Sequence, residues 1–416
     1  MVLVGPLVAS GAAVRYDFAM LRGLLWLVLA SSALVGTTAC GGTEKPVKKV
    51  VKKPPAVDSR KVLADARDLA KNGDVDGADK KYGEAYAAGK SFDVLEERVD
   101  FLIHSGKVTR AQEVAKEYYD GNATDVKGYN LYAETLLVGN KGQEALEVAD
   151  SMISFNADDP NAHEKRGRAL LILEKEQQGI EALRKAVQLD GASATYHEAL
   201  GTALHKLGEV NEAALEFRAA LKAAPEDAQA HVLLGMALRD QDQLDEARQY
   251  LDKAITIDPD NGRAYFELGL LLNKQGKQAD AEKALSNAVQ KSPNESLFWY
   301  AYGEIYRVQE RFDDAIAAYR KAVDIDPPHP KAAGKLGLVL VERKQYDEAE
   351  SVLTKAIQRD PKNALAHLHL GTVYAAKKKN KQAIESFETF LKLAPKNDPD
   401  LKRAKEAISE LKRRGG

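Results

Sequence analysis

The chain has 416 residues, of which 44% are hydrophobic and 29% are charged, and its formal net charge at pH 7 is −2. This balance lacks the positive excess of a nucleic-acid binder, and the hydrophobic content is too high for a disordered chain. Its one cysteine, Cys40, excludes both an intramolecular disulfide and a metal site with several thiolate ligands.

The first element is an uncharged apolar run from Gly23 to Val35, which follows Arg22 and precedes four small residues and Cys40. A basic N-terminal region, a short apolar stretch and small residues at the cleavage site are the parts of a secretory signal. As a helix the run would span roughly 20 Å, against roughly 30 Å for the hydrocarbon core of a bilayer, so we expect no stable transmembrane helix here. Met20 opens this signal at a suitable distance and is predicted to be the true start.

The residues that close this segment, GTTAC at 36–40, resemble the lipobox of bacterial lipoproteins, in which the cysteine is lipidated and becomes the mature N-terminus. The resemblance implies a signal peptide over 1–39 and lipidation of Cys40. Thr37 stands where the motif usually has Leu or a similar residue, so ordinary secretion with an incidental cysteine stays open. Residues 40–58, dense in Lys, Pro and Val, are expected to form an extended tether, with or without attraction to anionic head groups.

The rest of the chain is dominated by a 34-residue period. Glycine makes up 30 of 416 residues, so its recurrence at seven successive places with this spacing has a chance on the order of 10⁻⁷. Alanine and proline recur with the same period. We call the glycines the framework glycines; they are Gly167, Gly201, Gly235, Gly269, Gly303, Gly337 and Gly371. We call the alanines the framework alanines; they are Ala213, Ala247, Ala281, Ala315, Ala349 and Ala383.

Each unit is predicted to form two short amphipathic helices. In residues 244–259 the apolar side chains of Leu244, Ala247, Leu251 and Ala254 are spaced by three and four, which is typical of a helix with one buried face. Glycine on the first helix and alanine on the second permit a close crossing of the two backbones. The Asp-Pro pair that follows ends the second helix, because proline lacks an amide donor and disfavours helical geometry in its predecessor.

These residues, in this order and at this spacing, resemble the tetratricopeptide repeat. Residues 160–397 hold seven well-matched units and 59–159 three divergent ones. The segment 398–416 is expected to form a helix that covers the last apolar end. The resemblance implies an all-α fold, a right-handed α-solenoid superhelix of about ten helix-turn-helix repeats with a C-terminal capping helix.

We expect no enzymatic activity, no cofactor and no bound metal, because the sequence has no HExxH, GxSxG or GxxxxGK[ST] motif. Histidines recur four residues before four of the framework glycines, but other flat rings hold the same place in two further units. Packing of a ring between helices is therefore favoured over a ligand role. The rings are His163, His197, His231, Tyr265, Trp299 and His367.

In tetratricopeptide proteins the first helix of each unit lines the concave face and holds the ligand. The resemblance therefore implies an apolar groove suited to an amphipathic helix or an extended apolar segment of a partner protein. Burial of some of these residues against neighbouring repeats is the alternative. An acidic stretch is expected at Asp93, Glu96, Glu97, Asp100 and Glu134. The groove residues are Val232, Met236, Phe266, Leu270, Leu297, Tyr300, Leu338, Leu365 and Leu368.

Together these features predict a lipid-anchored periplasmic scaffold or assembly factor of a bacterial cell envelope, of the kind that serves secretins, pili, outer-membrane proteins or motility complexes. Its partners would be other proteins and, through the anchor, a membrane, but neither nucleic acid nor a small-molecule substrate. Gly41 stands where an Asp would resemble an inner-membrane retention signal, so the outer membrane is expected. A regulatory adaptor of peptidoglycan synthases or hydrolases is the alternative. A repeat-associated glycosyltransferase is remote, because only about 18 residues follow the last unit.

Overall fold

A computed structural model describes residues 58–327, 329 and 331–415. These residues form 21 α-helices and no β-strand. The predicted signal segment, Cys40 and all but the last residue of the predicted tether lie outside the described residues. Within the described part, no helix is both long enough and apolar enough to cross a lipid bilayer.

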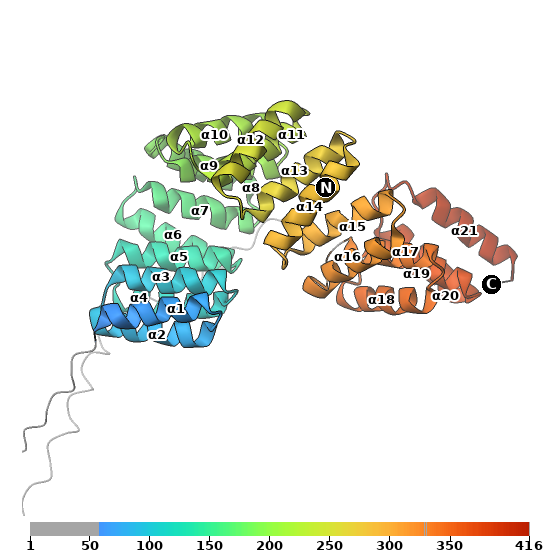
Figure 1. The fold of residues 1–416 in the computed structure, drawn as a ribbon, viewed down its shortest axis with the longest axis horizontal. Helices are drawn as coiled ribbons and strands as arrows, with labels where there is room; N and C mark the ends of the chain where they lie inside the picture. Colours follow the sequence, from blue (N-terminus) through green and yellow to red (C-terminus); the bar gives the residue numbers. More distant parts are fainter. Residues whose placement is uncertain (1–57, 328, 330, 416) are drawn as a thin grey trace, which may run out of the picture. The chain divides into compact units, whose positions relative to one another are not determined.

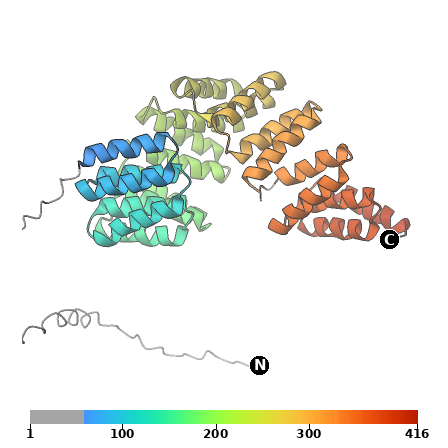
Figure 2. The same cartoon turned by 60° about the horizontal axis from the view of Figure 1, so that its bottom comes forward.

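The first 20 helices form ten pairs, and each pair stacks on the next in chain order (Figures 1 and 2). The first helices of the pairs are α1 (Ser59–Lys71), α3 (Phe92–His104), α5 (Val126–Val138), α7 (Pro160–Ile172), α9 (Ala194–Lys206), α11 (Ala228–Asp240), α13 (Gly262–Lys274), α15 (Ser296–Val308), α17 (Ala332–Glu342) and α19 (Ala364–Ala376). The second helices are α2 (Val75–Gly89), α4 (Val108–Gly121), α6 (Gly142–Phe155), α8 (Glu176–Leu189), α10 (Val210–Ala223), α12 (Leu244–Ile257), α14 (Gln278–Lys291), α16 (Phe312–Ile325), α18 (Tyr346–Arg359) and α20 (Asn380–Leu393).

One further helix, α21 (Leu401–Arg413), packs on α20 and ends the stack. It buries Ala404, Ile408 and Leu411 and leaves its charged side chains exposed. The prediction of an all-α solenoid of about ten helical hairpins with a capping helix is therefore confirmed.

Successive first helices contact one another, as α5 does with α7 and α17 with α19, whereas successive second helices make far fewer contacts among themselves. The first helices therefore lie on the inner side of the stack. We call the surface that they form the first-helix face.

The two helices of a unit cross at the framework glycine. A Cβ atom built on Gly235 would lie 2.7 Å from Cγ of Leu251, which is closer than two carbon atoms can pack. The same conflict occurs at the other six framework glycines, each time with a Leu, Phe or Tyr side chain sixteen residues later. The six framework alanines on the second helices are fully buried. Only the smallest residues fit where these helices meet.

The turn between the two helices of each unit is also repeated. Two residues after every first helix stands a residue with φ between 56° and 84°, in the left-handed region. Glycine occupies four of these places, at 73, 106, 208 and 276, and non-glycine residues occupy the other six. Because this conformation costs little only for Gly and Asn, the remaining residues are held there by the packing of the two helices.

Most of the recurring rings tie down the loop that precedes their helix. In six units the ring donates a hydrogen bond from its N–H or O–H to the backbone carbonyl six residues earlier, as His231 Nε2 does to Pro225 at 3.0 Å and Trp299 Nε1 to Pro293 at 2.8 Å. Tyr265 occupies the same place and packs against the core. We call this place the ring position. The other four bonds run from Tyr129 to Ala123, His163 to Ala157, His197 to Gly191 and His367 to Pro361, at 2.9–3.2 Å.

These bonds give the rings the packing role that the sequence favoured, and among the described residues no group of three or more His, Cys, Asp or Glu is placed to hold a metal ion. Tyr129 in a divergent unit was missed by the sequence pattern. His369, two residues beyond the ring at His367, lies on another side of the helix, where burial and then the charges of Arg403 and Lys335 lower its pKa to about 4.

A Gly235→Ala substitution should destabilise the chain by about 1–3 kcal/mol, because the new methyl group forces Leu251 and the two backbones apart. Urea unfolding followed by circular dichroism would measure this change. Gly121→Ala is the matched control, since a Cβ atom there meets nothing within 4 Å, and it should be neutral or slightly stabilising. Equal stability of the two variants would contradict the proposed crossing.

Candidate partner-binding groove

Three of the nine predicted groove residues are not on the surface. Val232, Phe266 and Leu368 are only 1%, 3% and 3% exposed. They share one place in the repeat, on the side of the first helix that faces the next unit. The ring of Phe266 stacks on Phe298 of α15, with 4.5 Å between ring centres and 17° between planes. The prediction that these three side chains line a partner groove is therefore wrong, because contacts between neighbouring units bury them.

The other six predicted residues retain some exposure. Leu297 is the most open, at 45%. The ring of Tyr300 lies against Tyr319 and His329, and its burial raises the pKa of its hydroxyl to about 12. Met236, Leu270, Leu338 and Leu365 are half-buried. The apolar surface at α11 to α19 is thus smaller than the sequence suggested, and a partner role for these six residues stays a prediction.

The predicted acidic stretch is partly neutralised. Glu97 accepts two hydrogen bonds of 2.7 Å from the guanidinium of Arg67. Burial opposes the charge on Glu134, but the positive charges and hydrogen bonds of Lys165 and Arg168 outweigh it and lower its pKa to about 2. The exposed carboxylates of this stretch are Asp93, Glu96 and Asp100.

A depression of about 520 Å³ lies further along the first-helix face, over α5, α7, α9 and α11. Four successive first helices contribute to it, so its length follows the direction of stacking. We call it the α5–α11 groove. Its apolar lining comes from Leu137, Leu171, Ile172, Ala199, Ala203 and Leu233, and its polar lining from Asn140, Glu164, Arg168, Glu174, Thr195, Glu198, Thr202, Lys206 and Gln229.

Charges at one end of the α5–α11 groove are fixed by an ion-pair network. Glu164 is only 2% exposed and pairs with Lys165 at 3.0 Å and Arg168 at 3.1 Å. Arg168 also donates two hydrogen bonds to Glu134 on α5, at 2.9 and 3.0 Å. A partly buried carboxylate is strongly destabilised when its cation is removed, so this network holds α5 and α7 in register.

Glu198 on α9 is the one carboxyl group of the groove whose pKa is raised. It forms no ion pair with any described residue, and burial, followed by the negative charge of Asp227, raises its pKa to about 7. Near neutral pH the group is therefore divided between two forms. The protonated form can donate a hydrogen bond to a peptide carbonyl, and the ionised form can pair with a Lys or Arg of a bound segment.

None of the nine predicted residues lines the α5–α11 groove. The repeat register contained the necessary signal, because Glu164 and Glu198 stand at the same place in their units as Val232 and Phe266. The prediction selected apolar side chains at that place and passed over the polar ones.

The geometry defines a class of protein, a solenoid of helical hairpins that presents a preformed groove on its inner face. Two general tetratricopeptide repeat family models match residues 198–262 and 238–305, and the model for the tetratricopeptide domain of cytochrome c-type biogenesis protein H matches residues 280–401. The chain is a tetratricopeptide repeat protein, and such repeats are scaffolds for protein–protein interaction. No curated protein sequence matches it.

Solved structures show the same fold at low sequence identity. The human IFIT1 dimer with m7Gppp-AAAA has a TM-score of 0.53 and 17% identity, covering 78% of this chain and 82% of its own. The APC/C hetero-tetramer Cut9–Hcn1 has a TM-score of 0.51 and 13% identity, covering 76% of each chain. Yeast Tom70 has a TM-score of 0.50 and 15% identity, covering 85% of this chain and 95% of its own. These likenesses establish the fold alone.

Glu198→Gln should change how stability depends on pH. Between pH 4.5, the ordinary value for Glu, and about 7, the folded chain keeps a proton on Glu198 that the unfolded chain loses. The contribution of Glu198 to stability therefore falls as pH rises through this window, and Gln removes that fall. Urea unfolding at several pH values should show wild type losing stability relative to the variant. The exposed Glu181→Gln is the control, and a pH-independent difference for Glu198→Gln would contradict the raised pKa.

Proposed function

We propose that this chain is a lipid-anchored scaffold or assembly factor of a bacterial cell envelope, which holds partner proteins in the α5–α11 groove. The observation that carries the proposal is the groove itself, about 520 Å³ in volume and built from four successive first helices. Its apolar residues suit the apolar side chains of a peptide segment. Glu198, which lacks a partner among the described residues, and the exposed Lys206 supply polar groups that fix the orientation of that segment.

The mechanism is equilibrium binding to a preformed surface. Ion pairs across the units, such as Arg168 with Glu134, order the groove before a partner arrives, so little entropy is lost on binding. An anchor at Cys40 would raise the local concentration of the scaffold at the membrane. The proposed function is binding, in keeping with the typically non-catalytic role of tetratricopeptide families.

Two features support the envelope assignment. Residues 22–40 have the order of charge, apolar run, small residues and cysteine that a lipoprotein signal requires. The family model that matches residues 280–401 is named for a protein of cytochrome c-type biogenesis. We therefore favour the assembly of an envelope complex over other scaffold roles, and the periplasmic face of the outer membrane as its place.

Filling the groove should weaken capture of the partner. Thr195 and Thr202 are exposed on α9 and line the groove, so Thr195→Trp with Thr202→Trp adds two indole rings within it. After gentle crosslinking in cells, wild type should enrich an envelope protein that this variant enriches about tenfold less.

The control variant places two tryptophans on the second helix α10, by Leu215→Trp and Lys222→Trp at exposed positions, and it should retain the partner. Equal loss of the partner in the control variant would contradict the α5–α11 groove as the binding site. Enrichment of peptidoglycan synthases or hydrolases instead of assembly components would favour the adaptor function.

Cys40→Ala should release the chain from the membrane fraction, because the acyl chains supply the energy of attachment. Mass spectrometry of the mature wild-type protein should find an N-terminal lipidated cysteine. The control Thr43→Ala should keep both the membrane association and the lipidated cysteine. Gly41→Asp should move the protein from the outer to the inner membrane. A Cys40→Ala variant that still sediments with membranes would contradict the anchor as the sole attachment.

A further inference from the structure

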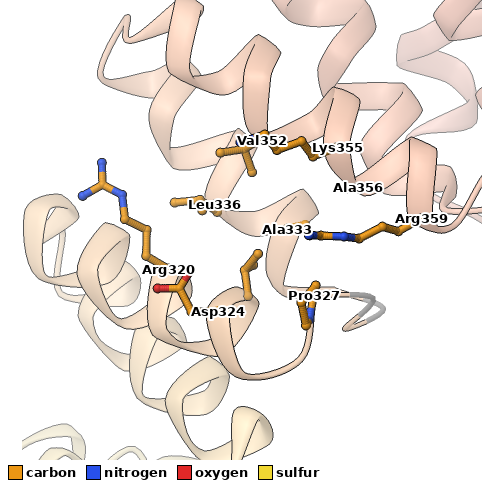
Figure 3. A pocket seen from close by; sticks show the side chains of 10 residues that line it. Arg320, Asp324, Pro327, Ala333, Leu336, Val352, Lys355, Ala356 and Arg359 are labelled. Atoms are coloured by element: carbon orange, nitrogen blue, oxygen red, sulfur yellow. The ribbon is translucent and has the colours of Figure 1, made fainter.

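A second cavity, of about 340 Å³, lies away from the α5–α11 groove, between α16, α17 and α18. Figure 3 shows Leu336 and Val352 at one end of it and Pro327 at the other. Its remaining lining is supplied by Arg320, Val323, Asp324, Ala333, Lys355, Ala356 and Arg359. We call it the Ala333 pocket.

Ala333 holds the ring position of its unit. It stands 34 residues after Trp299 and 34 before His367, and among the units from Tyr129 to His367 it is the one residue at this place without a ring. In the six units with the hydrogen bond described above, the ring binds the carbonyl six residues earlier. Here the residue six positions earlier is Pro327, and it lines the pocket.

The wall of the pocket opposite Ala333 also matches the surroundings of the ring in other units. Val352 occupies the place that Glu216 and Tyr250 hold in their units. Glu216 accepts a hydrogen bond from the ring of His197 at 2.6 Å, and Tyr250 lies 5.7 Å from the ring of His231. The Ala333 pocket is thus bounded by the residues that elsewhere contact the ring, and it is the space that a ring fills in the neighbouring units.

Helix α17, which borders this space, begins later than the 34-residue period predicts. The 34-residue period places the beginning of this helix at residue 330, but α17 begins at Ala332 and has 11 residues, where the other first helices have 13. His329 caps it, because its Nδ1 accepts a hydrogen bond from the N–H of Ala332 at 3.0 Å, while burial lowers its pKa. A neutral His329 therefore fixes the late start beside the pocket.

Positive charge dominates the rim. Arg320 pairs with Glu348 at 3.0 Å. Lys355 and Arg359 are exposed and form no ion pair with any described residue, and Asp324 is the single carboxylate of the lining. Two unpaired cations beside an apolar slot favour an aromatic side chain carried on an acidic segment.

We propose that the Ala333 pocket binds an aromatic side chain, foremost an indole, presented by an acidic segment of a partner protein. The ring of the partner takes the place of the missing ring of the unit, and its N–H donates to the carbonyl of Pro327. Lys355 and Arg359 pair with the carboxylates that flank it. This docking site is separate from the α5–α11 groove and does not depend on the proposed function of that groove.

The test uses a fluorescein-labelled peptide, DEWDE, and its ring-free counterpart, DEADE, titrated with purified protein residues 41–416 and followed by fluorescence anisotropy. Wild type should bind DEWDE about tenfold more tightly than DEADE. Ala333→Trp, which supplies the ring from within, should weaken DEWDE binding about tenfold and leave the melting temperature unchanged or higher. Ala333→His, which supplies the ring that four other units carry at this position, should act in the same direction.

Two controls separate this site from others. Ala317→Trp adds the same ring at an exposed position of α16 and should bind DEWDE like wild type, as should the groove-filled variant with Thr195→Trp and Thr202→Trp. Lys355→Glu with Arg359→Glu should weaken binding about tenfold. Equal binding of both peptides, undiminished binding by Ala333→Trp and Ala333→His, or marked destabilisation by both of these variants would overturn the proposal. If wild type forms a dimer that Ala333→Trp dissociates, the pocket binds a second copy of this chain, and the proposal of a partner protein is overturned.

Discussion

The close crossing of two helices at a glycine is the constraint on which this structure depends. At Gly235 and its six equivalents, no atom beyond Cα fits against the side chain sixteen residues later. Repeating one crossing at a fixed interval gives every unit nearly the same shape, so each unit stacks on the last in the same way. The stacking in turn brings successive first helices together on the inner side. The α5–α11 groove is a product of that regularity, since no single unit contains it.

Because the units are so alike, a unit that lacks an interaction found in the others is easily recognised. In six units the ring position ties the first helix to the loop before it, and in three of them the accepting carbonyl belongs to a proline of the 34-residue period, as at Pro225 and Pro293. Where the ring is missing, at Ala333, the same neighbours surround a cavity. In the groove, the departure is electrostatic, because Glu198 stands without a cation at a place where Glu164 has two. Both proposed binding sites therefore lie where one unit lacks an interaction that another unit has.

The sequence was sufficient to predict the fold because 34-residue spacing constrains every unit at once. It was insufficient for the binding surface. Val232 and Phe266 look exposed on a single amphipathic helix, and only the position of the next first helix shows that they are covered. The pattern also gave no reason to notice Ala333, since the meaning of a missing ring depends on the carbonyl six residues earlier and on Val352 across the pocket. Contacts between units, which the period does not encode, decide which side chains remain accessible.

The central claim is that partners bind the first-helix face at α5, α7, α9 and α11. Hydrogen-exchange mass spectrometry of the chain, with and without the protein that it captures in cells, tests this claim most directly. The account predicts slower exchange in these four first helices and little change in the second helices α6, α8 and α10 that lie behind them. Protection confined to those second helices, or to α1–α4, would contradict it.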